Sequence, residues 1–369
     1  MKILQVIDSL GIGGAEKLIV DIVPKMSNEN LKIDVLLLNG EKTSFYDKLE
    51  AENCCNIFSL GKSYYNPLHI LRIIPYLSKY DLIHVHLFPV LYYVAIAKFI
   101  SRSKVPLIFT EHSTGNKRMN NSKLRNIERW IYSKYEKIIC ITPQVKEMLT
   151  SSLGIDEKKL EIIENGIDLD TIIRQDAYDK SFLNYTKEDK LMIMVAGFRE
   201  QKDQETVIQA LKFLPSKYKL ILVGDGIRRP VLEKLVKKLD FENRVDFLGI
   251  RSDVYSLYKM CDVAILSSHW EGFGLAAAEA MACKIPTLAS NVVGLAEVVD
   301  NGGILFEKGN SQELAEKILD LEDEHYHKEI MQRGYNKSKQ YSIEKMIEKL
   351  LTIYNSEHNK GNRNFLGNG

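Results

Sequence analysis

The sequence predicts an α/β protein built from two doubly wound domains. Short apolar runs of the kind that form buried parallel strands alternate with helical patterns along most of the 369 residues. The alternation begins at the N-terminus and starts again after residue 170. The length of the chain agrees with this division, since it corresponds to about two domains.

The first set of elements occupies residues 1–170. Residues 3–7 form a near-continuous apolar run, which is typical of a strand covered by helices on both faces. In residues 15–26, apolar side chains fall on one helical face. Further strands are predicted at 33–38, 56–60, 82–86, 107–110, 137–142 and 160–163, and helices at 68–77, 90–100 and 124–133.

The second set occupies residues 171–342 and begins with a polar stretch at 171–190 that we interpret as the hinge. A last helix is predicted at 343–354, followed by a polar tail at 355–369 that we expect to be frayed. Strands are predicted at 192–196, 219–223, 245–247, 263–267, 287–290 and 303–306, and helices at 204–214, 229–239, 254–260, 275–283 and 312–321.

Composition excludes several classes of protein. Fifty Lys and Arg balance 49 Asp and Glu, for a net charge of +1, so a broad nucleic-acid surface is not expected. The longest mostly apolar run, residues 87–100, contains Lys98 and is shorter than the roughly 20 residues of a membrane-spanning helix. The N-terminus lacks the apolar core of a signal peptide, and the five cysteines form no CxxC pair. These features predict a reduced, cytoplasmic enzyme.

A glycine-rich loop, Gly11-Ile12-Gly13-Gly14-Ala15-Glu16, follows the first predicted strand and precedes a helix. Such a loop lets the backbone approach an anion at the helix N-terminus. A dinucleotide-binding fingerprint would place Gly or Ala where this chain has Glu16. Nicotinamide binding and a turn without a ligand both remain open alternatives at this point.

Three histidines lie at or just after predicted strand ends in the first half. His112 follows a strand and is expected to face the crevice where ligands of open α/β sheets bind. For His84, which lies within its strand, a structural role is favoured; His86 ends the same strand. The pair Asp168 and Asp170 resembles a metal-binding DxD motif only in its letters, and no metal site is predicted.

The second half contains a more specific pattern. Glu271-Gly272-Phe273-Gly274-Leu275 follows a predicted strand and opens an Ala-rich helix that carries Glu279. Loop amides and the positive end of the helix dipole can hold a phosphate. The two carboxylates can each bind sugar hydroxyls. The alternative is that neither glutamate binds a ligand: Glu271 would complement the helix dipole, and Glu279 would be solvated.

Two further loops are predicted at the same sheet edge. Gly197-Phe198-Arg199-Glu200-Gln201-Lys202 carries two basic residues suited to a diphosphate, and Gly224-Asp225-Gly226 adds a close backbone approach. Neither loop is specific alone. Together with the glutamates they outline one anion-binding crevice.

These motifs resemble those of the retaining glycosyltransferases of family 4, also called group 1, and the resemblance spans nearly the whole chain. That family has the GT-B fold, in which two Rossmann-like domains face each other across a cleft. The resemblance implies that the C-terminal domain binds a nucleotide sugar, as co-substrate rather than cofactor, and that the N-terminal domain binds the acceptor. It also implies that the helix at 343–354 crosses back to the first domain. The motifs are Gly13-Gly14-Ala15-Glu16, Thr110-Glu111-His112, Glu164-Asn165-Gly166-Ile167-Asp168, Gln201-Lys202, Val223-Gly224-Asp225-Gly226 and Glu271-Gly272-Phe273-Gly274-Leu275 with Glu279.

By resemblance, Lys202 pairs with the donor diphosphate, Glu279 holds the ribose, and Glu271 contacts the transferred sugar. His112 lines the reaction centre. The implied catalytic residues are His112, Lys202 and Glu271. The implied donor site consists of Gly13, Gly14, Arg199, Lys202, Gly224, Glu271, Gly272, Phe273, Gly274, Leu275 and Glu279.

One position departs from the family pattern. Relatives usually carry Arg five residues before the Lys, where this chain has Gly197, and Arg199 is the candidate substitute. Base rates in the family favour a UDP-sugar donor and a glycan or lipid-linked acceptor in cell-surface polysaccharide synthesis. The alternatives are a nucleotide-sugar epimerase on the same fold and a non-catalytic nucleotide-sugar-binding regulator.

Residues 116–137 form a basic segment with aromatic side chains, including Lys117, Arg118, Lys123 and Arg125. A basic amphipathic helix of this kind can lie on an anionic membrane surface. Leu124, Ile127, Ile131 and Tyr135 follow helical spacing, so the alternative is a helix that packs this stripe into the first domain.

Overall fold

The computed structural model describes residues 1–115, 118 and 121–366, with the backbone alone at 122, 123 and 361–366. It divides into two compact units. Unit 1 comprises Met1–Asn165 and Ile343–Gly369, and unit 2 comprises Gly166–Ser342. Among the described residues, no helix is long and apolar enough to cross a membrane.

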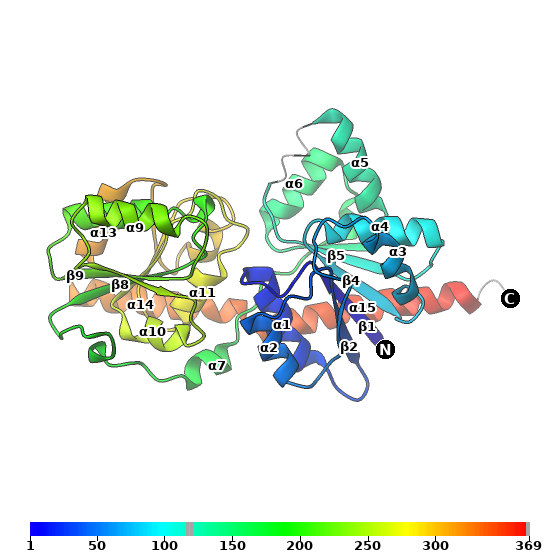
Figure 1. Ribbon diagram of the computed structural model, residues 1–369, viewed down its shortest axis with the longest axis horizontal. Coiled ribbons are helices and arrows are strands. Elements are labelled where there is room, and N and C mark those ends of the chain that lie inside the picture. Colours follow the sequence, from blue (N-terminus) through cyan, green and yellow to red (C-terminus); the bar gives the residue numbers. More distant parts are fainter. Residues whose placement is uncertain (116–117, 119–120, 367–369) are drawn as a thin grey trace. The chain divides into compact units, whose positions relative to one another are not determined.

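Unit 1 contains a seven-stranded parallel sheet in the order β3-β2-β1-β4-β5-β6-β7. Helices α1, α2 and α15 lie on one side of this sheet, and α3, α4 and α5 lie on the other (Figure 1). The strands are β1 (Lys2–Ile7), β2 (Lys32–Leu37), β3 (Ile57–Ser59), β4 (Leu82–His86), β5 (Leu107–Glu111), β6 (Lys137–Cys140) and β7 (Leu160–Ile162). The helices are α1 (Gly14–Met26), α2 (Ser44–Ala51), α3 (His69–Ile73), α4 (Val90–Ser101), α5 (Ser122–Ser133), α6 (Pro143–Leu153) and α15 (Ile343–Leu366).

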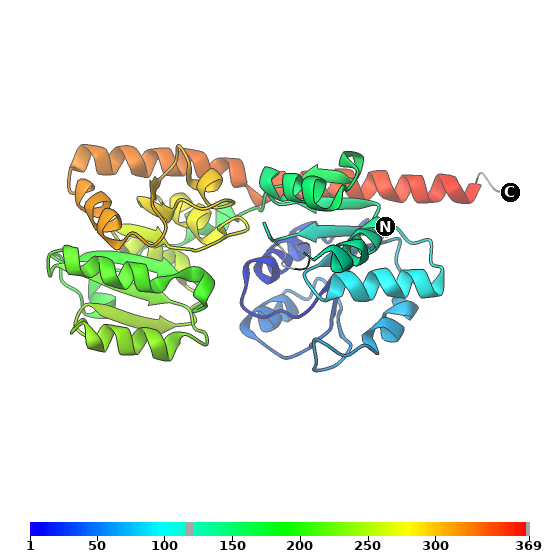
Figure 2. The same cartoon turned by 90° about the horizontal axis from the view of Figure 1, so that it is seen from above.

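Unit 2 contains a six-stranded parallel sheet in the order β10-β9-β8-β11-β12-β13. Helices cover both faces of this sheet as well (Figure 2). The strands are β8 (Lys190–Val195), β9 (Tyr218–Val223), β10 (Val245–Gly249), β11 (Val263–Leu266), β12 (Thr287–Ser290) and β13 (Ile304–Phe306). The helices are α7 (Leu169–Arg174), α8 (Gln204–Ala210), α9 (Arg229–Lys238), α10 (Val254–Met260), α11 (Leu275–Ala282), α12 (Ala296–Val299), α13 (Ser311–Asp320) and α14 (Glu324–Ser338).

The predicted fold class is confirmed, because both sheets are parallel and doubly wound. Central strands such as β11 are buried along their whole length, which explains their continuous apolar sequence. In each sheet the strand order reverses direction next to the first strand of the unit, between β1 and β4 and between β8 and β11. These two places are the topological switch points.

The units divide at Asn165 and Gly166, a few residues before the predicted boundary at 170. The reason is that α7 packs within unit 2, where Lys259 Nζ donates to the carbonyl oxygen of Ile172 at 2.6 Å. At the other end, α15 continues to Leu366 through the segment that the sequence predicts to be frayed. Glu357 in this extension is buried and pairs with Lys360 at 2.7 Å, so the polar composition of the segment does not prevent helix formation.

Candidate functional site

The loops at the switch points contain most of the site residues predicted from the sequence. In unit 2, Arg199 and Lys202 follow β8, and residues 271–275 follow β11. In unit 1, Gly13 and Gly14 follow β1, and His112 follows β5. Ligands of open α/β sheets bind beyond the carboxyl ends of the strands at such points. Each unit therefore presents its own candidate binding edge.

Lys202 and Glu271 contact each other directly. The Lys202 ammonium donates a short hydrogen bond to a carboxylate oxygen of Glu271, and both side chains are largely buried. The backbone N–H of Gly272 donates to the other Glu271 oxygen at 3.1 Å. The structure thus brings two predicted catalytic residues of unit 2 into one ion pair.

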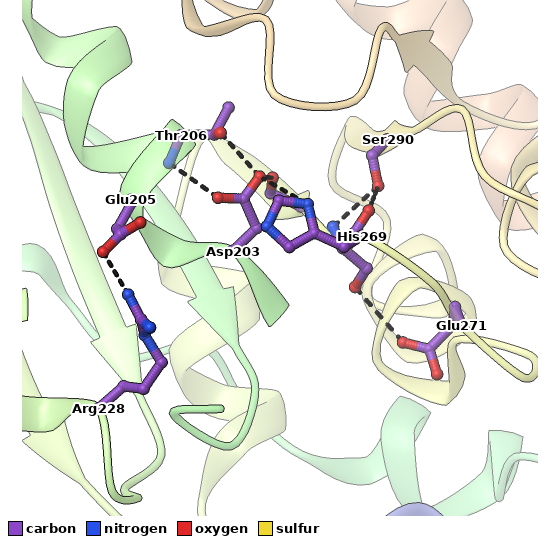
Figure 3. Close-up of polar contacts among 9 residues, drawn as sticks. Asp203, Glu205, Thr206, Arg228, His269, Glu271 and Ser290 are labelled. Carbon is purple, nitrogen blue, oxygen red and sulfur yellow. Dashed lines mark hydrogen bonds and ion pairs between the residues drawn. The ribbon is translucent and has the colours of Figure 1, made fainter. Parts of the chain in front are cut away.

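Asp203 links the loop after β8 to the end of β11 by hydrogen bonds, and it was not predicted from the sequence. It has φ +43°, is buried, and accepts hydrogen bonds from Thr206 Oγ1 at 2.7 Å and Ser267 Oγ at 3.2 Å. Figure 3 shows Asp203 between Thr206 and His269. The Asp-x-x-Thr spacing of a helix N-cap was the available signal.

Polar contacts of the backbone hold the same loops together. The backbone N–H of His269 donates to the carbonyl oxygen of Gln201 at 2.8 Å, and Gln201 Nε2 donates to the carbonyl oxygen of Trp270 at 3.0 Å. Ser290 Oγ accepts from the Ser268 N–H and donates to the Ser268 carbonyl, both at 2.8 Å. The loops are therefore preorganised around the Lys202–Glu271 pair.

The glycine loop leads directly into α11. Gly274 has φ +88°, which favours glycine, and a Cβ there would lie 2.5 Å from Leu295 Cδ1, so that Leu295 would have to shift. The Phe273 side chain is buried and packs edge-to-face on Tyr341 with a centroid distance of 5.2 Å. Its ring belongs to the core of unit 2. Only its backbone is available to a ligand.

Glu279 lies on the second turn of α11 and is buried. It accepts a hydrogen bond from Tyr255 Oη at 3.0 Å. Tyr255 comes from α10, and no sequence motif marks it. The phenol orients the carboxylate that the family resemblance assigns to the ribose.

Arg199 is exposed, and its side chain folds back toward Gly197. A Cβ at residue 197 would lie 3.8 Å from Arg199 Nε, which is ordinary contact. Gly224 also has a packing role, and its predicted approach to a ligand stays a prediction. A Cβ there would lie 2.1 Å from the carbonyl oxygen of Ala196, so this glycine allows the loops after β8 and β9 to pack together.

In unit 1, Gly13 is the N-cap of α1 and Gly14 is its first residue. A Cβ at Gly13 would lie 2.4 Å from a carboxylate oxygen of Glu16. Glu16 thus occupies the space beside the first turn of α1, and its charge complements the helix dipole.

The three histidines of unit 1 form a cluster. His86 Nδ1 and His112 Nε2 are 3.2 Å apart, and the rings of His84 and His86 have a centroid distance of 4.2 Å. Burial lowers the pKa of His84 to about 3 and that of His112 to about 4, and it lowers the pKa of His86 well below its usual range. All three rings are neutral at pH 7.

Asp168 is the N-cap of α7 and accepts from the backbone N–H of Thr171 at 3.0 Å. Asp170 lies in the first turn of the same helix. Across the described part of the chain, no group of three or more His, Cys, Asp and Glu side chains is arranged to hold a metal ion.

The basic segment contains α5, whose apolar residues face two ways. Ile131 and Tyr135 are buried, whereas Leu124 and Ile127 are 39% and 50% exposed. The predicted stripe is therefore buried in unit 1 only toward its C-terminal end, and its N-terminal part is exposed. Lys117 lies outside the described residues, as does the side chain of Lys123.

Two doubly wound units, each with its candidate residues at a switch point, define a protein of the GT-B class. Residues 12–171 match the family described as Glycosyltransferase Family 4, and residues 177–341 match Glycosyl transferases group 1. The chain is 31% identical over 281 residues to the uncharacterized glycosyltransferase MJ1178 of Methanocaldococcus jannaschii, covering 74% of this chain and 75% of that protein. The chain belongs to the group 1, family 4 glycosyltransferases and uses a nucleotide sugar.

Two other similar proteins carry informative names. N-acetylgalactosamine-N,N'-diacetylbacillosaminyl-diphospho-undecaprenol 4-alpha-N-acetylgalactosaminyltransferase of Campylobacter jejuni is 27% identical over 363 residues, or 93% of this chain and 96% of that one. The crystal structure of Anabaena HepE in complex with UDP-glucose has a TM-score of 0.84 and 25% identity, and the match covers 96% of this chain and all of that one.

Proposed function

We propose that this chain is a retaining hexosyltransferase that moves a sugar from a UDP-sugar to a glycan or lipid-linked acceptor in cell-surface polysaccharide synthesis. The observation that carries the proposal is the Lys202–Glu271 pair at the start of α11, with Glu279 held by Tyr255 further along the same helix. A structure similar to this chain was solved with UDP-glucose, and a relative acts on an undecaprenyl diphosphate according to its name.

The chemistry follows from where charge develops. When the bond between the sugar and the diphosphate breaks, negative charge grows on the β-phosphate oxygen. Lys202 and the amides of residues 272–275 are donors suited to that charge, and one preorganised donor is worth roughly 3–4 kcal/mol. Arg199 supplies a second cation beside position 197. The catalytic role of His112 and the retaining course rest on family resemblance.

The first experiment measures thermal shifts of the full chain with UDP-, GDP- and ADP-sugars, and then transfer to glycan and polyprenyl-diphosphate acceptors. We expect UDP-sugars to raise the melting temperature of the wild type and not of Glu279→Ala. Transfer should occur only with an acceptor, and NMR of the product should show the anomeric configuration of the donor. Conversion of the donor without an acceptor would indicate an epimerase, and binding without turnover a regulator.

We also propose that the enzyme acts at the cytoplasmic face of a membrane, touching anionic lipid through α5. The exposed side chains Leu124, Ile127 and Trp130 recur every three residues along this helix. Trp130 packs edge-to-face on the exposed Phe99 of α4 with a centroid distance of 5.2 Å, and Lys134 Nζ lies 4.6 Å from the Trp130 ring. A strip of apolar side chains beside basic ones suits the boundary of an anionic bilayer.

Co-sedimentation with anionic vesicles tests this second proposal. Wild type should pellet at low salt and be released as salt screens the attraction. Ile127→Gln with Trp130→Gln should pellet less and keep the thermal shift with donor. Arg118 is left unchanged, because its guanidinium pairs with buried Glu128 at 2.7 Å. Equal pelleting by wild type and variant would contradict the proposal.

A further inference from the structure

A chain of hydrogen bonds runs through the core of unit 1 from α15 to His112. Gln5 Nε2 donates to Tyr354 Oη at 3.1 Å, and Gln5 Oε1 lies 2.9 Å from His86 Nε2. His86 Nδ1 lies 3.2 Å from His112 Nε2. Gln5, His86 and Tyr354 are buried, and we refer to these four residues as the histidine chain.

Along the histidine chain, the donor and acceptor of one hydrogen bond determine those of the next. Because the amide nitrogen of Gln5 donates to Tyr354, its oxygen is the end that faces His86 and must accept. His86 therefore carries its proton on Nε2, and its Nδ1 has a lone pair. A neutral His86 then accepts from His112, so the proton of His112 is on Nε2.

A second branch leaves Tyr354 without touching His112. His84 Nδ1 lies 2.6 Å from Tyr354 Oη, and His84 Nε2 lies 2.7 Å from Thr110 Oγ1. The phenol oxygen accepts from Gln5, so its own proton is free to bond to His84. In this arrangement His84 accepts from the phenol at Nδ1 and donates from Nε2 to Thr110.

His112 is the one partly exposed member of the histidine chain. Among the described residues, no side chain or backbone group forms a hydrogen bond with its Nδ1. A neutral imidazole with its proton on Nε2 offers a lone pair at Nδ1. A hydroxyl group is the natural donor for such an acceptor.

We propose that Gln5, His86 and Tyr354 are positioning residues that hold His112 as the Nε2-protonated tautomer, so that Nδ1 accepts a hydrogen bond from a sugar hydroxyl. Only the identity of the ligand rests on the proposed function. The tautomer is a property of unit 1 alone. It gives α15, which follows the whole of unit 2 in the sequence, a defined role in the reaction centre.

The first test reads the tautomer without substrate. Full-length protein labelled with 15N-histidine is studied at pH 7 by long-range 1H–15N correlation, and His112→Asn identifies the signals of His112. Wild type should show a protonated Nε2 and an unprotonated Nδ1. Gln5→Met, which has a similar volume and no amide, should shift His112 toward a mixture of tautomers, as should Tyr354→Phe. Thr110→Val is the matched control, since it removes a buried hydroxyl from the other branch and should leave His112 unchanged.

The second test measures transfer with the donor found in the panel. Gln5→Met should lower kcat about tenfold, the scale of one lost hydrogen bond, and leave the KM of the donor within about twofold. Thr110→Val should stay near wild type in both. A proton on Nδ1 in wild type, or an unchanged tautomer in Gln5→Met, would overturn the positioning role.

The remaining outcomes are also decisive. A changed tautomer with unchanged kcat would overturn the hydrogen bond to the ligand. If Tyr354→Phe does not fold, Gln5→Met carries the test. A wild type that transfers no sugar would contradict the proposed function, whereas the NMR result would still decide the role of Gln5 and His86.

Discussion

The ammonium of Lys202 is paired with the carboxylate of Glu271, 69 residues further along the chain. The pair joins the loop after β8 to the loop after β11. A bound diphosphate would bring further negative charge to the same ammonium. On the proposed function, Lys202 would have two anionic partners, the Glu271 carboxylate and the substrate diphosphate.

Replacing Lys202 separates these two roles. Lys202→Met should lower kcat by about 10²-fold or more, the effect of losing one preorganised donor at a developing anion. The single variant also leaves Glu271 without its countercharge. The double variant Lys202→Met with Glu271→Gln removes both charges. Steady-state kinetics of the double variant should remain as low, and recovery toward wild type would assign the defect of the single variant to the orphaned Glu271.

Arg199 offers a test by rescue. Arg199→Ala should raise the KM of the nucleotide sugar several-fold, because the diphosphate loses one partly solvated cation. Gly197→Arg placed in that background should restore the KM, since a Cβ at 197 meets only an ordinary contact there, with the carbonyl oxygen of Asp225 at 3.9 Å. Gly197→Ala in the same background is the control. No change in KM for Arg199→Ala would exclude this arginine from the donor site.

Gly274→Ala should destabilise unit 2 through both strain and overlap with Leu295. The matched control is Gly309→Ala, where φ is +80° and no described atom lies within 4 Å of the added Cβ. Positive φ costs each variant on the order of 1 kcal/mol. Gly274→Ala should therefore melt lower than Gly309→Ala in calorimetry, and Gly274→Val lower still. Equal melting temperatures would show that Leu295 moves aside without cost.

Glu111 predicts a pH dependence of stability. Burial raises the pKa of this carboxyl from 4.5 to about 7, although the Tyr132 hydroxyl and the Ser113 N–H donate to it. The folded state therefore keeps a proton that the unfolded state has released, and stability falls as pH rises from about 4.5 to 7. The melting temperature of wild type should decline relative to Glu111→Gln across this range. The three histidines contribute an opposite pH dependence, which cancels when the melting temperature of the variant is subtracted from that of wild type. A difference in melting temperature that does not change with pH would contradict the raised pKa.

Transfer should survive EDTA. The proposed function assigns the leaving group to Lys202 and the amides at the start of α11, and Asp168 is engaged as the N-cap of α7. Initial rates with and without chelator should agree within error. Complete loss of activity, restored by magnesium or manganese, would reassign Asp168 and Asp170 as ligands.

Some elements were predictable because their own residues carry the signal. The strand predicted at 263–267 extends one residue beyond β11, whose four residues are all buried and apolar. The helix α14 escaped prediction because only Ile330, Gly334 and Ser338 are buried along it, which gives no apolar stripe to recognise.

Some residues of the candidate site were likewise predictable from local sequence, and others were not. The glutamates that bracket the start of α11 follow from spacing within one segment. The partners of Glu279 and His84 do not, because Tyr255 and Tyr354 reach them through tertiary packing, the latter from 270 residues away. Even the role of Gly224 depends on Ala196, a neighbour that only the folded sheet provides.

The return of α15 to unit 1 has a consequence for the order of synthesis. Residues 166–342 are continuous and contain all of unit 2, so this unit is complete as soon as its last residue leaves the ribosome. Unit 1 begins first, yet its core lacks Leu350 and Tyr354 until nearly the whole chain has been made. A nascent chain that stalls after residue 342 would hold a finished unit 2 and a unit 1 with an open core, in which His84 and Gln5 still lack the phenol of Tyr354.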